Sequence, residues 1–565
     1  MKKLKPMIYI LLFGLLTTSF VGCKSKVPEN LNMAKDLYYQ GKVKESLTYF
    51  DKVIKGDSKN NEGYFGKSMA LKYLEEYKIL SSFISSGVKL VDAPFKDGVK
   101  GEALALLGSG ASGDTYYVKG ISLCDKLLLK SPTDYYLNRD KALLLLLTNK
   151  YDDALKAVEI GLSSKPKDED LLMLKGNILY DKCKFSDAIV VYDLIIKANS
   201  KNAFAYTFKG NCLKELSQYT EAIASYNSAV SINVQFDLPY YYKGLILADQ
   251  ENSTDAVKSF QKVLDICEND INNDKNNGHA IFYKVLCLKE GSNVADANDS
   301  IAAALKYNPA SYEYINEKAS LLAAQSMLED AVKLYDAALK NNPNEEILLT
   351  NKGEALNSEK KYTDAVTLFD KAISINSYFR FAYTGKAEAL QGLNKGEEAV
   401  KSYDLAIALD GTNPTIFNDK GNLLYLLKKY PEAIDCYSSA IKFNISSAVY
   451  YDNRGNGYLS LNKYPEAEAD YDKAISLKPD NGVYYFNKGK AYYGEKKYQE
   501  ALDSFDKSIS LNPKGNYYYN WRGATLYYLD KKDDALKSFQ QSVTMTPDDE
   551  SSKKWINFLQ GKGFQ

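Results

Sequence analysis

One spacing, 34 residues, recurs along most of this chain of 565 residues. An alanine marks the same point of twelve successive units, and every gap but one is 34 residues long, the exception lying between Ala256 and Ala297. The alanines are Ala154, Ala188, Ala222, Ala256, Ala297, Ala331, Ala365, Ala399, Ala433, Ala467, Ala501 and Ala535. A fixed period of this length indicates a repeat architecture, in which each unit buries its apolar face against its neighbours.

Two more positions of each unit are restricted, and their spacing predicts a pair of helices. Four residues after the alanine stands a large apolar residue, aromatic in ten of the twelve units, such as Tyr471 and Phe505. Twelve residues before it stands glycine or alanine in every unit but one, which has Val285. Residues four apart share one face of a helix. A small residue on a preceding helix allows close approach, so we expect a helix hairpin in each unit.

Proline placement supports this prediction. Seven of the fourteen prolines stand in the segment that ends a unit, as Pro479 and Pro513 do. Pro431 and Pro465 stand at the expected first turn of a second helix, where the missing N–H costs no hydrogen bond. No proline falls in a predicted helix interior, where it would break the helix.

This pattern resembles the tetratricopeptide repeat, which combines a period of 34 residues with glycine, alanine, an aromatic residue and proline at fixed places. One example is the run from Tyr485 through Gly489, Ala501 and Phe505 to Pro513. The resemblance implies an all-α fold, a right-handed superhelical solenoid of about twelve clear hairpins and about three divergent ones. The predicted parts are divergent repeats at 27–134, four repeats at 135–270, a polar insertion at 271–277, eight repeats at 278–549, and a capping helix and tail at 550–565.

The sequence pattern of the N-terminus is typical of a segment that is removed when a protein is processed. Lys2, Lys3 and Lys5 precede an apolar run at 7–21, which is too short to span a bilayer comfortably. The run ends at Cys23, after which the chain becomes polar, and this junction resembles a bacterial lipoprotein lipobox. The resemblance implies a signal peptide at 1–22, a lipidated anchor and linker at 23–26, and a protein held on the extracytoplasmic face of the membrane. An uncleaved anchor or an ordinary secretory signal is the alternative.

Composition excludes several classes of function. Lys and Arg together number 72, as do Asp and Glu, so no net charge favours nucleic acid. His279 is the single histidine, and the six cysteines after Cys23 have no paired spacing, which disfavours metal sites and catalysis. No phosphate loop or nucleophile motif is present in the sequence. We therefore expect no enzyme activity, no cofactor and no small-molecule substrate.

The tetratricopeptide pattern implies that positions 2, 5, 9 and 12 of the first helix line a concave groove. Asparagine and tyrosine recur there, and both suit an extended peptide, since amides pair with peptide backbone and tyrosine adds contact area. The candidate groove residues are Asn177, Tyr180, Asn211, Lys214, Asn418, Asn422, Tyr425, Asp452, Asn456, Phe486, Lys490, Tyr493, Tyr517, Asn520 and Tyr527.

Two functions remain open from these residues. The first is a membrane-anchored scaffold that binds a protein or extended peptide in its groove and helps to assemble the cell envelope. The second is a surface lipoprotein that binds cell-wall carbohydrate through tyrosine and asparagine. In both, a lipid anchor is the only expected contact with the membrane.

Overall fold

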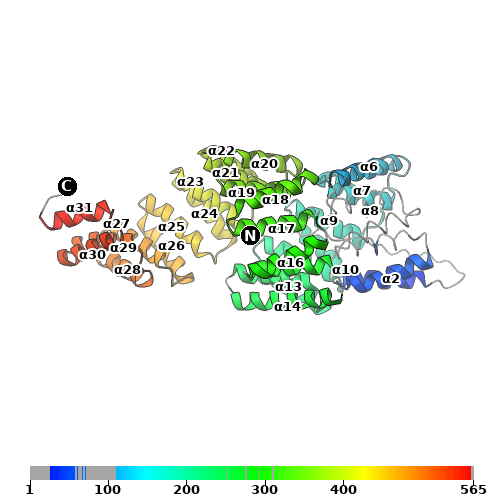
Figure 1. Cartoon of the computed structure of the whole chain (residues 1–565), viewed down its shortest axis with the longest axis horizontal. Coiled ribbons are helices and arrows are strands. Elements are labelled where there is room, and N and C mark those ends of the chain that lie inside the picture. The colour runs from blue at the N-terminus through cyan, green and yellow to red at the C-terminus, as the bar shows by residue number, and fades with distance from the viewer. Residues whose placement is uncertain are drawn as a thin grey trace. The chain divides into compact units, whose positions relative to one another are not determined.

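The computed structural model describes residues 26–57, 60, 66–67, 70, 110–250, 252–273, 277–291, 293–307, 309 and 311–561. Every regular element in these residues is an α-helix, and successive helices pack as hairpins (Figure 1). The predicted all-α solenoid of helix hairpins is therefore confirmed. The expected signal peptide, Cys23 and most of the divergent stretch at 61–94 lie outside the described residues.

The chain divides into two compact units, unit 1 (1–394 with 408–410) and unit 2 (395–407 with 411–565). The helices of unit 1 are α1 (Val27–Tyr39), α2 (Val43–Gly56), α6 (Gly110–Leu128), α7 (Tyr135–Leu147), α8 (Tyr151–Ser164), α9 (Glu169–Asp181), α10 (Phe185–Ala198), α11 (Ala203–Glu215), α12 (Tyr219–Ile232), α13 (Asp237–Asp249), α14 (Ser253–Asn273), α15 (Gly278–Glu290), α16 (Val294–Tyr307), α17 (Tyr312–Ala324), α18 (Leu328–Asn341), α19 (Glu346–Ser358), α20 (Tyr362–Ile375) and α21 (Arg380–Gly392). Those of unit 2 are α22 (Gly396–Leu409), α23 (Pro414–Leu426), α24 (Tyr430–Phe443), α25 (Ala448–Ser460), α26 (Tyr464–Leu477), α27 (Gly482–Gly494), α28 (Tyr498–Leu511), α29 (Asn516–Tyr528), α30 (Lys532–Met545) and α31 (Glu550–Leu559). From α7 onward, the odd-numbered helix of each hairpin is called helix A and the even-numbered one helix B.

Helices A and B meet where the sequence predicts their contact. A Cβ atom on Gly489 would lie 2.6 Å from the Phe505 ring, and one on Gly455 would lie 2.7 Å from the Tyr471 ring. Both rings are fully buried. In these two hairpins the aromatic ring of helix B therefore rests on the backbone of helix A, in space that a side chain at Gly489 or Gly455 would take.

Among the described residues from α7 onward, ten hairpins turn through one non-glycine residue in the left-handed conformation, for example Cys183 (φ 57°) and Lys496 (φ 65°). At the second of these turns, the Lys496 and Lys497 amides donate to the carbonyls of Tyr493 and Tyr492 at 3.0 and 2.9 Å. These bonds satisfy carbonyl groups that the end of helix A would otherwise leave unpaired. Because the turn residue is not glycine, the sequence alone does not mark it.

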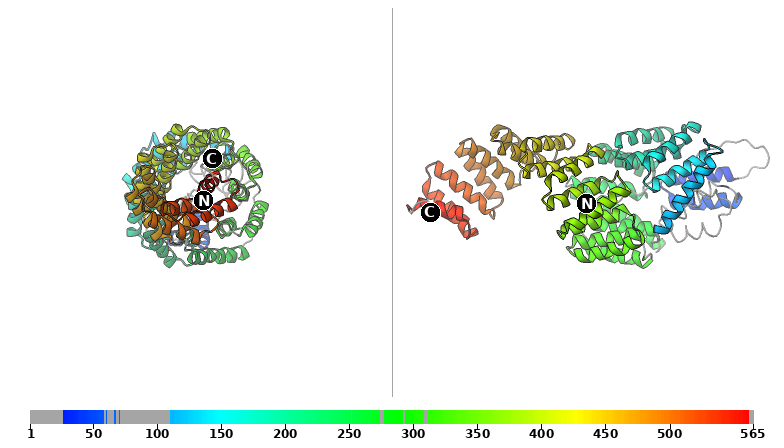
Figure 2. Two further views of the ribbon diagram at one scale, coloured as in Figure 1. Left: turned by 90° about the vertical axis from the view of Figure 1, so that its left-hand side faces the viewer. Right: turned by 90° about the horizontal axis from the view of Figure 1, so that it is seen from above.

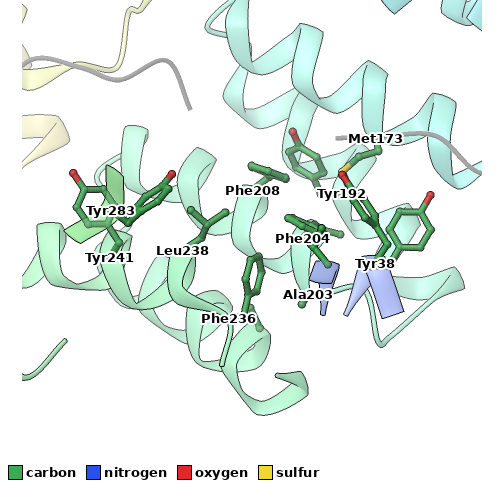
Figure 3. Close-up of a cluster of buried hydrophobic side chains, with 14 of the residues drawn as sticks. Tyr38, Met173, Tyr192, Ala203, Phe204, Phe208, Phe236, Leu238, Tyr241 and Tyr283 are labelled. Carbon is green, nitrogen blue, oxygen red and sulfur yellow. The ribbon is translucent and has the colours of Figure 1, made fainter. Parts of the chain in front are cut away.

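An aromatic core joins the first hairpin of unit 1 to later repeats (Figure 3). The ring of Tyr38 in α1 lies 5.4 Å from that of Phe204 in α11, and Phe204 lies 4.9 Å from Phe236. The hydroxyl of Tyr39 donates a hydrogen bond to Asp170 of α9, which is 131 positions further along the chain. Unit 1 is thus held together by contacts between distant repeats as well as by contacts between neighbours.

The polar insertion expected at 271–277 does not begin as a loop. Helix α14 has 21 residues, against 14 in α12, and it runs through Asn273. The seven additional helical residues amount to about two turns. Asn277 then caps α15, because its side-chain oxygen accepts a hydrogen bond from the Ala280 amide at 3.1 Å.

Helix α31 closes the last hairpin of unit 2. The Trp555 ring stacks on Phe539 at 5.4 Å with an interplanar angle of 5°, and it lies 5.0 Å from the Tyr527 ring. A solenoid needs such a cover, because the face that each repeat buries against the next is left open at its end.

Candidate functional site

The helices A of unit 1 line a cavity of about 1060 Å³. Its lining comes from α9, α11, α13, α15, α17, α19 and α21, with two side chains from α18 and one from α20. The end-on view of Figure 2 shows the green helices of this unit following a curved path. Because consecutive repeats present helix A toward the same side, their concave faces combine into one cavity.

Negatively charged side chains outnumber positively charged ones in the lining of this cavity. Six carboxylates line the cavity and two lysines accompany them; the carboxylates are Glu215, Asp249, Glu290, Glu317, Glu354 and Glu388. Both lysines are paired with a lining carboxylate, Lys214 with Glu215 and Lys289 with Glu317, each at 2.8 Å. With all groups ionised, the lining carries a net charge of about four negative units.

Two of the carboxyl groups have perturbed acidity. Burial raises the pKa of Asp249, and the nearby Lys214 ammonium lowers it only in part. Burial also raises the pKa of Glu290, where the Asp249 carboxylate adds to the effect and Lys289 opposes it. Crowding of like charges out of water favours the neutral form. A cation placed between Asp249 and Glu290 would relieve both effects.

Tyrosines and small polar side chains form the rest of the polar lining. Tyr180, Tyr241, Tyr242, Tyr335 and Tyr362 border the cavity. The rings of Tyr241 and Tyr242 lie 5.5 Å apart, so part of the wall is aromatic. An aromatic face beside carboxylates suits an ammonium or guanidinium group, which gains from both.

Three of the four unit 1 residues predicted to line the groove, Tyr180, Asn211 and Lys214, border the cavity. The prediction is wrong for Asn177, which is buried and accepts a hydrogen bond from the Tyr192 hydroxyl at 2.7 Å. Asn211 is also buried and accepts the Tyr226 hydroxyl at 2.7 Å. Both asparagines hold helix A to helix B, so neither is a freely presented groove side chain.

The same link recurs in unit 2, although Asn422 itself is exposed. The Asn422 side-chain oxygen accepts the Tyr437 hydroxyl at 2.9 Å, and Asn456 accepts the Tyr471 hydroxyl at 3.0 Å. In all four links the partners are 15 positions apart. Asn422 and Asn456, which the sequence predicts to line the groove, therefore also hold helix A to helix B.

Other candidates in unit 2 connect one repeat to the next. Asn418 is buried and accepts the Asn453 amide at 2.8 Å, and the Tyr425 hydroxyl lies 3.0 Å from that of Ser460. Asp452 accepts the Asn487 amide at 2.8 Å. Burial raises the pKa of Asp452 to about 6, although hydrogen bonds from Asn487 and Asn456 oppose the rise.

The remaining candidates belong to an aromatic cluster in α27, α29 and α31. Phe486 is buried against Phe505 and Tyr518, so its expected place on an open groove is wrong. The Lys490 ammonium lies 5.1 Å from the centre of its ring. Tyr493 packs edge to face on Trp521, and Tyr517 does so on Phe486. Tyr527 packs edge to face on Phe558 of α31, and the Asn520 amide donates to Ser552 of the same helix. Of these, Tyr517 is exposed.

The acidic lining was missed by sequence reasoning, although a signal for part of it is present. The last residue of helix A is acidic in four successive hairpins, as Asp181, Glu215, Asp249 and Glu290. In the last four helices A of unit 2, that position holds Leu426, Ser460, Gly494 and Tyr528. A charge confined to one position of successive repeats accumulates on one face of a solenoid.

Within the described residues, no helix is long and apolar enough to span a membrane, and no group of histidine, cysteine, aspartate and glutamate is arranged to hold a metal ion. The cysteines in this part of the chain are free thiols, and burial raises the pKa of Cys212, Cys267 and Cys287. A thiol held in its neutral form is a poor nucleophile.

Family profiles identify the repeats. Tetratricopeptide repeat profiles match residues 139–203, 205–234, 288–346, 316–378, 450–481 and 483–514. Both units of this chain therefore contain tetratricopeptide repeats, and such repeats form protein-binding scaffolds. A search of curated proteins finds no match.

The solved structures that this chain resembles include the following three. The APC/C hetero-tetramer Cut9–Hcn1 has 13% identity and a TM-score of 0.45, covering 95% of this chain and 96% of that one. YrrB, described as having an unusual peptide-binding site, has 24% identity and a TM-score of 0.29, covering 33% of this chain and 95% of that one. PilF of Pseudomonas aeruginosa has 18% identity and a TM-score of 0.33, covering 37% of this chain and 96% of that one.

Proposed function

We propose that this chain is a non-catalytic scaffold that binds an extended, positively charged polypeptide segment in the cavity of unit 1. The observation that carries the proposal is the cavity lining, in which six carboxylates face two lysines that are already paired. Tetratricopeptide repeats are protein-binding scaffolds in general, and the charge of this lining selects the chemistry of the partner.

The geometry suits lysine and arginine side chains in three ways. Opposite charge speeds the encounter and disfavours acidic partners. The raised pKa values of Asp249 and Glu290 indicate carboxyl groups that a cation would stabilise in their charged form. The tyrosines supply flat apolar surface for the methylene groups of the partner.

The cellular setting remains part of the proposal. We infer that Cys23 carries lipid and holds the protein on the extracytoplasmic face of a bacterial membrane. Cationic segments of envelope proteins would then be the partners, and assembly or retention of such proteins would be the role. The apolar run at 7–21 and its junction with Cys23 support this inference.

Carbohydrate binding is the second candidate, and one observation favours it. Tyr517 and Tyr528 are 45% and 51% exposed in unit 2, so they offer ring surface to a sugar. However, the Tyr528 ring stacks on Tyr498 at 4.9 Å, and Tyr517 packs edge-on against Phe486. Much of this aromatic surface is therefore occupied by neighbouring rings.

Fluorescence anisotropy with labelled peptides tests the proposal. A lysine-rich peptide should bind, a glutamate-rich peptide of equal length should not, and added salt should weaken binding. The double variant Asp249→Asn/Glu290→Gln should weaken binding about tenfold or more, because it removes two lining charges with little change of shape.

The matched control is Asp187→Asn/Glu221→Gln, which removes two exposed charges from helices B of the same unit. It should bind as the wild type does. Equal weakening by both double variants would indicate a general charge effect. Saturable binding of wall polysaccharide, with none of the lysine-rich peptide, would favour the second candidate.

A further inference from the structure

Two parts of unit 1 that are far apart in sequence contact each other. The segment that connects α20 to α21, together with the first turn of α21, meets α8, α11 and the turn between α9 and α10. The partners are separated by 165 to 226 positions, whereas neighbouring repeats are only 34 apart. We call this contact the clasp; its members are Tyr151, Asp152, Lys182, Glu215, Tyr378 and Arg380.

Arg380 is the charged centre of the clasp. Its guanidinium is buried and forms ion pairs with Glu215 and with Asp410, the latter at 3.2 Å. It also donates to the Cys183 sulfur at 3.4 Å. Burial alone would lower the pKa of Arg380, but the carboxylates of Glu215 and Asp410 raise it above its ordinary value. The pairing compensates for burial of the cation.

Tyr378 forms the second half of the clasp. Its ring meets that of Tyr151 edge-on, with centroids 5.6 Å apart, and its hydroxyl donates to Asp152 at 3.1 Å. The Lys182 ammonium pairs with Asp152 and lies 4.8 Å from the centre of the Tyr378 ring. The Asn376 amide adds a hydrogen bond to the Tyr151 hydroxyl at 3.2 Å.

These residues are particular to one repeat. The position of Arg380, first in its helix A, holds Glu346 in the preceding hairpin and Pro414 in the following one. The position of Tyr378 likewise holds Asn344 and Thr412. The basic repeat pattern needs neither arginine nor tyrosine at these places, so the clasp is an addition to the solenoid.

Glu215 joins the clasp to the candidate site. It lines the acidic cavity, yet one of its oxygens holds Arg380 while the other holds Lys214 and lies 3.4 Å from the Tyr180 hydroxyl. The chain's own guanidinium thus occupies a carboxylate that would otherwise be open to a cationic ligand. Two cations that use one carboxylate oxygen compete, and such competition is reciprocal.

We propose that the clasp closes unit 1 around the acidic cavity and restricts access from the side, so that a cationic segment and Arg380 compete for Glu215. The proposal rests on the proposed function for the ligand, but closure itself concerns only this chain. A partner with a free end can thread into a closed cavity. A segment flanked by folded domains enters only when the clasp opens.

The structural test measures clasp opening without any ligand. Labels carried on non-natural side chains at Lys184 and Ser377, both exposed, report the separation across the clasp. The double variant Asn376→Ala/Tyr378→Ala and the single variant Arg380→Ala should each broaden and lengthen the measured distance. Circular dichroism checks that each variant remains helical, and the milder double variant keeps the buried ion pairs.

Arg454→Ala is the control. Its guanidinium pairs with Asp470 at 2.7 Å within a single hairpin of unit 2, so the distance across the clasp should not change. A helical clasp variant that keeps the wild-type distance would overturn the proposal.

The binding test uses one lysine-rich peptide in two forms, with free ends and with a folded domain fused to each end. In the wild type, the free peptide should associate about tenfold faster or more, whereas the clasp variants should accept both forms at similar rates. Equal rates in the wild type would overturn restricted access. If neither form binds the wild type, the proposed function fails, and the distance measurement alone decides whether the clasp closes unit 1.

Discussion

The asparagine at the ninth position of helix A is a packing residue in this chain. Its amide oxygen receives the hydroxyl of the tyrosine that helix B places over the preceding glycine. A buried hydroxyl without a partner would lose the hydrogen bonds that it makes to water. Helix B carries tyrosine opposite each of Asn177, Asn211, Asn422 and Asn456, and phenylalanine opposite Leu245, Glu354, Lys490 and Ala524; two further tyrosines, Tyr335 and Tyr403, stand opposite Ser320 and Glu388. The sequence therefore contains the pairing, but it becomes apparent only when residues 15 positions apart are compared.

A double-mutant cycle on Asn456 and Tyr471 tests this role. Asn456→Ala should cost about 1–3 kcal/mol of unfolding free energy, because the buried Tyr471 hydroxyl loses its acceptor. Combined with Tyr471→Phe, the cost should be clearly less than the sum of the two single costs. Urea unfolding gives the three values, and strict additivity would show that the hydrogen bond contributes nothing.

Asp452 should make the stability of unit 2 depend on pH. Its folded pKa of about 6 lies above its ordinary value, so the folded state binds the proton more tightly than the unfolded state. Stability from this group is therefore present at low pH and is lost as pH rises from about 4 to 6. Asp452→Asn should remove that loss and raise the unfolding free energy at pH 7 by roughly 1–3 kcal/mol. Thermal melts across this range measure the effect, and an unchanged pH profile in the variant would contradict it.

At the scale of elements, the contact between helices A and B of each hairpin, which we call the seam, follows from the sequence pattern alone. The spacing of small residue, alanine and aromatic residue predicts which faces of helices A and B meet, and Gly489 under Phe505 is one such contact. Two features of the helices and turns could not be predicted from the sequence pattern. The turn residue in left-handed conformation has no preferred type. Helix α14 continues as far as Asn273, into the expected insertion, because polar side chains suit an exposed helix end as well as a loop.

Ion pairs also connect elements in a regular way. Lysines of helix A reach a carboxylate 16 positions earlier, in helix B of the preceding hairpin, as Lys209–Asp193 and Lys488–Asp472 do at 2.7 and 2.6 Å. The carboxylates are about half exposed, so water and salt screen the attraction. We therefore expect each such pair to contribute little to stability.

The contact between Gly489 and Phe505 predicts that a second substitution can recover stability lost in a first one. Gly489→Ala should lower the unfolding free energy by about 1–3 kcal/mol, because the new methyl group would lie 2.6 Å from the Phe505 ring. Shortening the ring side chain by Phe505→Leu should recover part of that loss in the double variant. Gly411→Ala is the control, since its nearest neighbour would be at 3.4 Å. A double variant less stable than either single variant would contradict the seam geometry.

At the scale of the whole molecule, the candidate site could be predicted only in part. The repeat pattern indicated which helices face the concave side, and Tyr180, Asn211 and Lys214 do border the cavity. Its acidic character depends on curvature, which brings residues as distant as Glu215 and Glu388 to one space. The contact of Arg380 with Glu215 depends on the same curvature. Neither the acidic cavity nor the Arg380–Glu215 contact could be predicted from residue spacing, because a local sequence pattern does not determine how strongly a solenoid curves.

The lipid anchor belongs to this scale as well. Cys23→Ala should release the protein from membranes, because acyl chains are the expected attachment and two chains are needed for stable anchoring. Fractionation together with incorporation of labelled fatty acid measures the change. Unchanged labelling or unchanged membrane association in the variant would reject lipidation at Cys23.

Site-specific photo-crosslinking to a lysine-rich peptide tests the central claim most directly. A photoreactive side chain would replace Leu245, which lines the cavity, or Val190, which is exposed on α10, or Tyr517 in unit 2. The cavity account predicts that position 245 captures the peptide, that positions 190 and 517 do not, and that excess unlabelled peptide abolishes the capture. Capture at 517 or 190 with none at 245 would place the binding surface elsewhere and contradict the account.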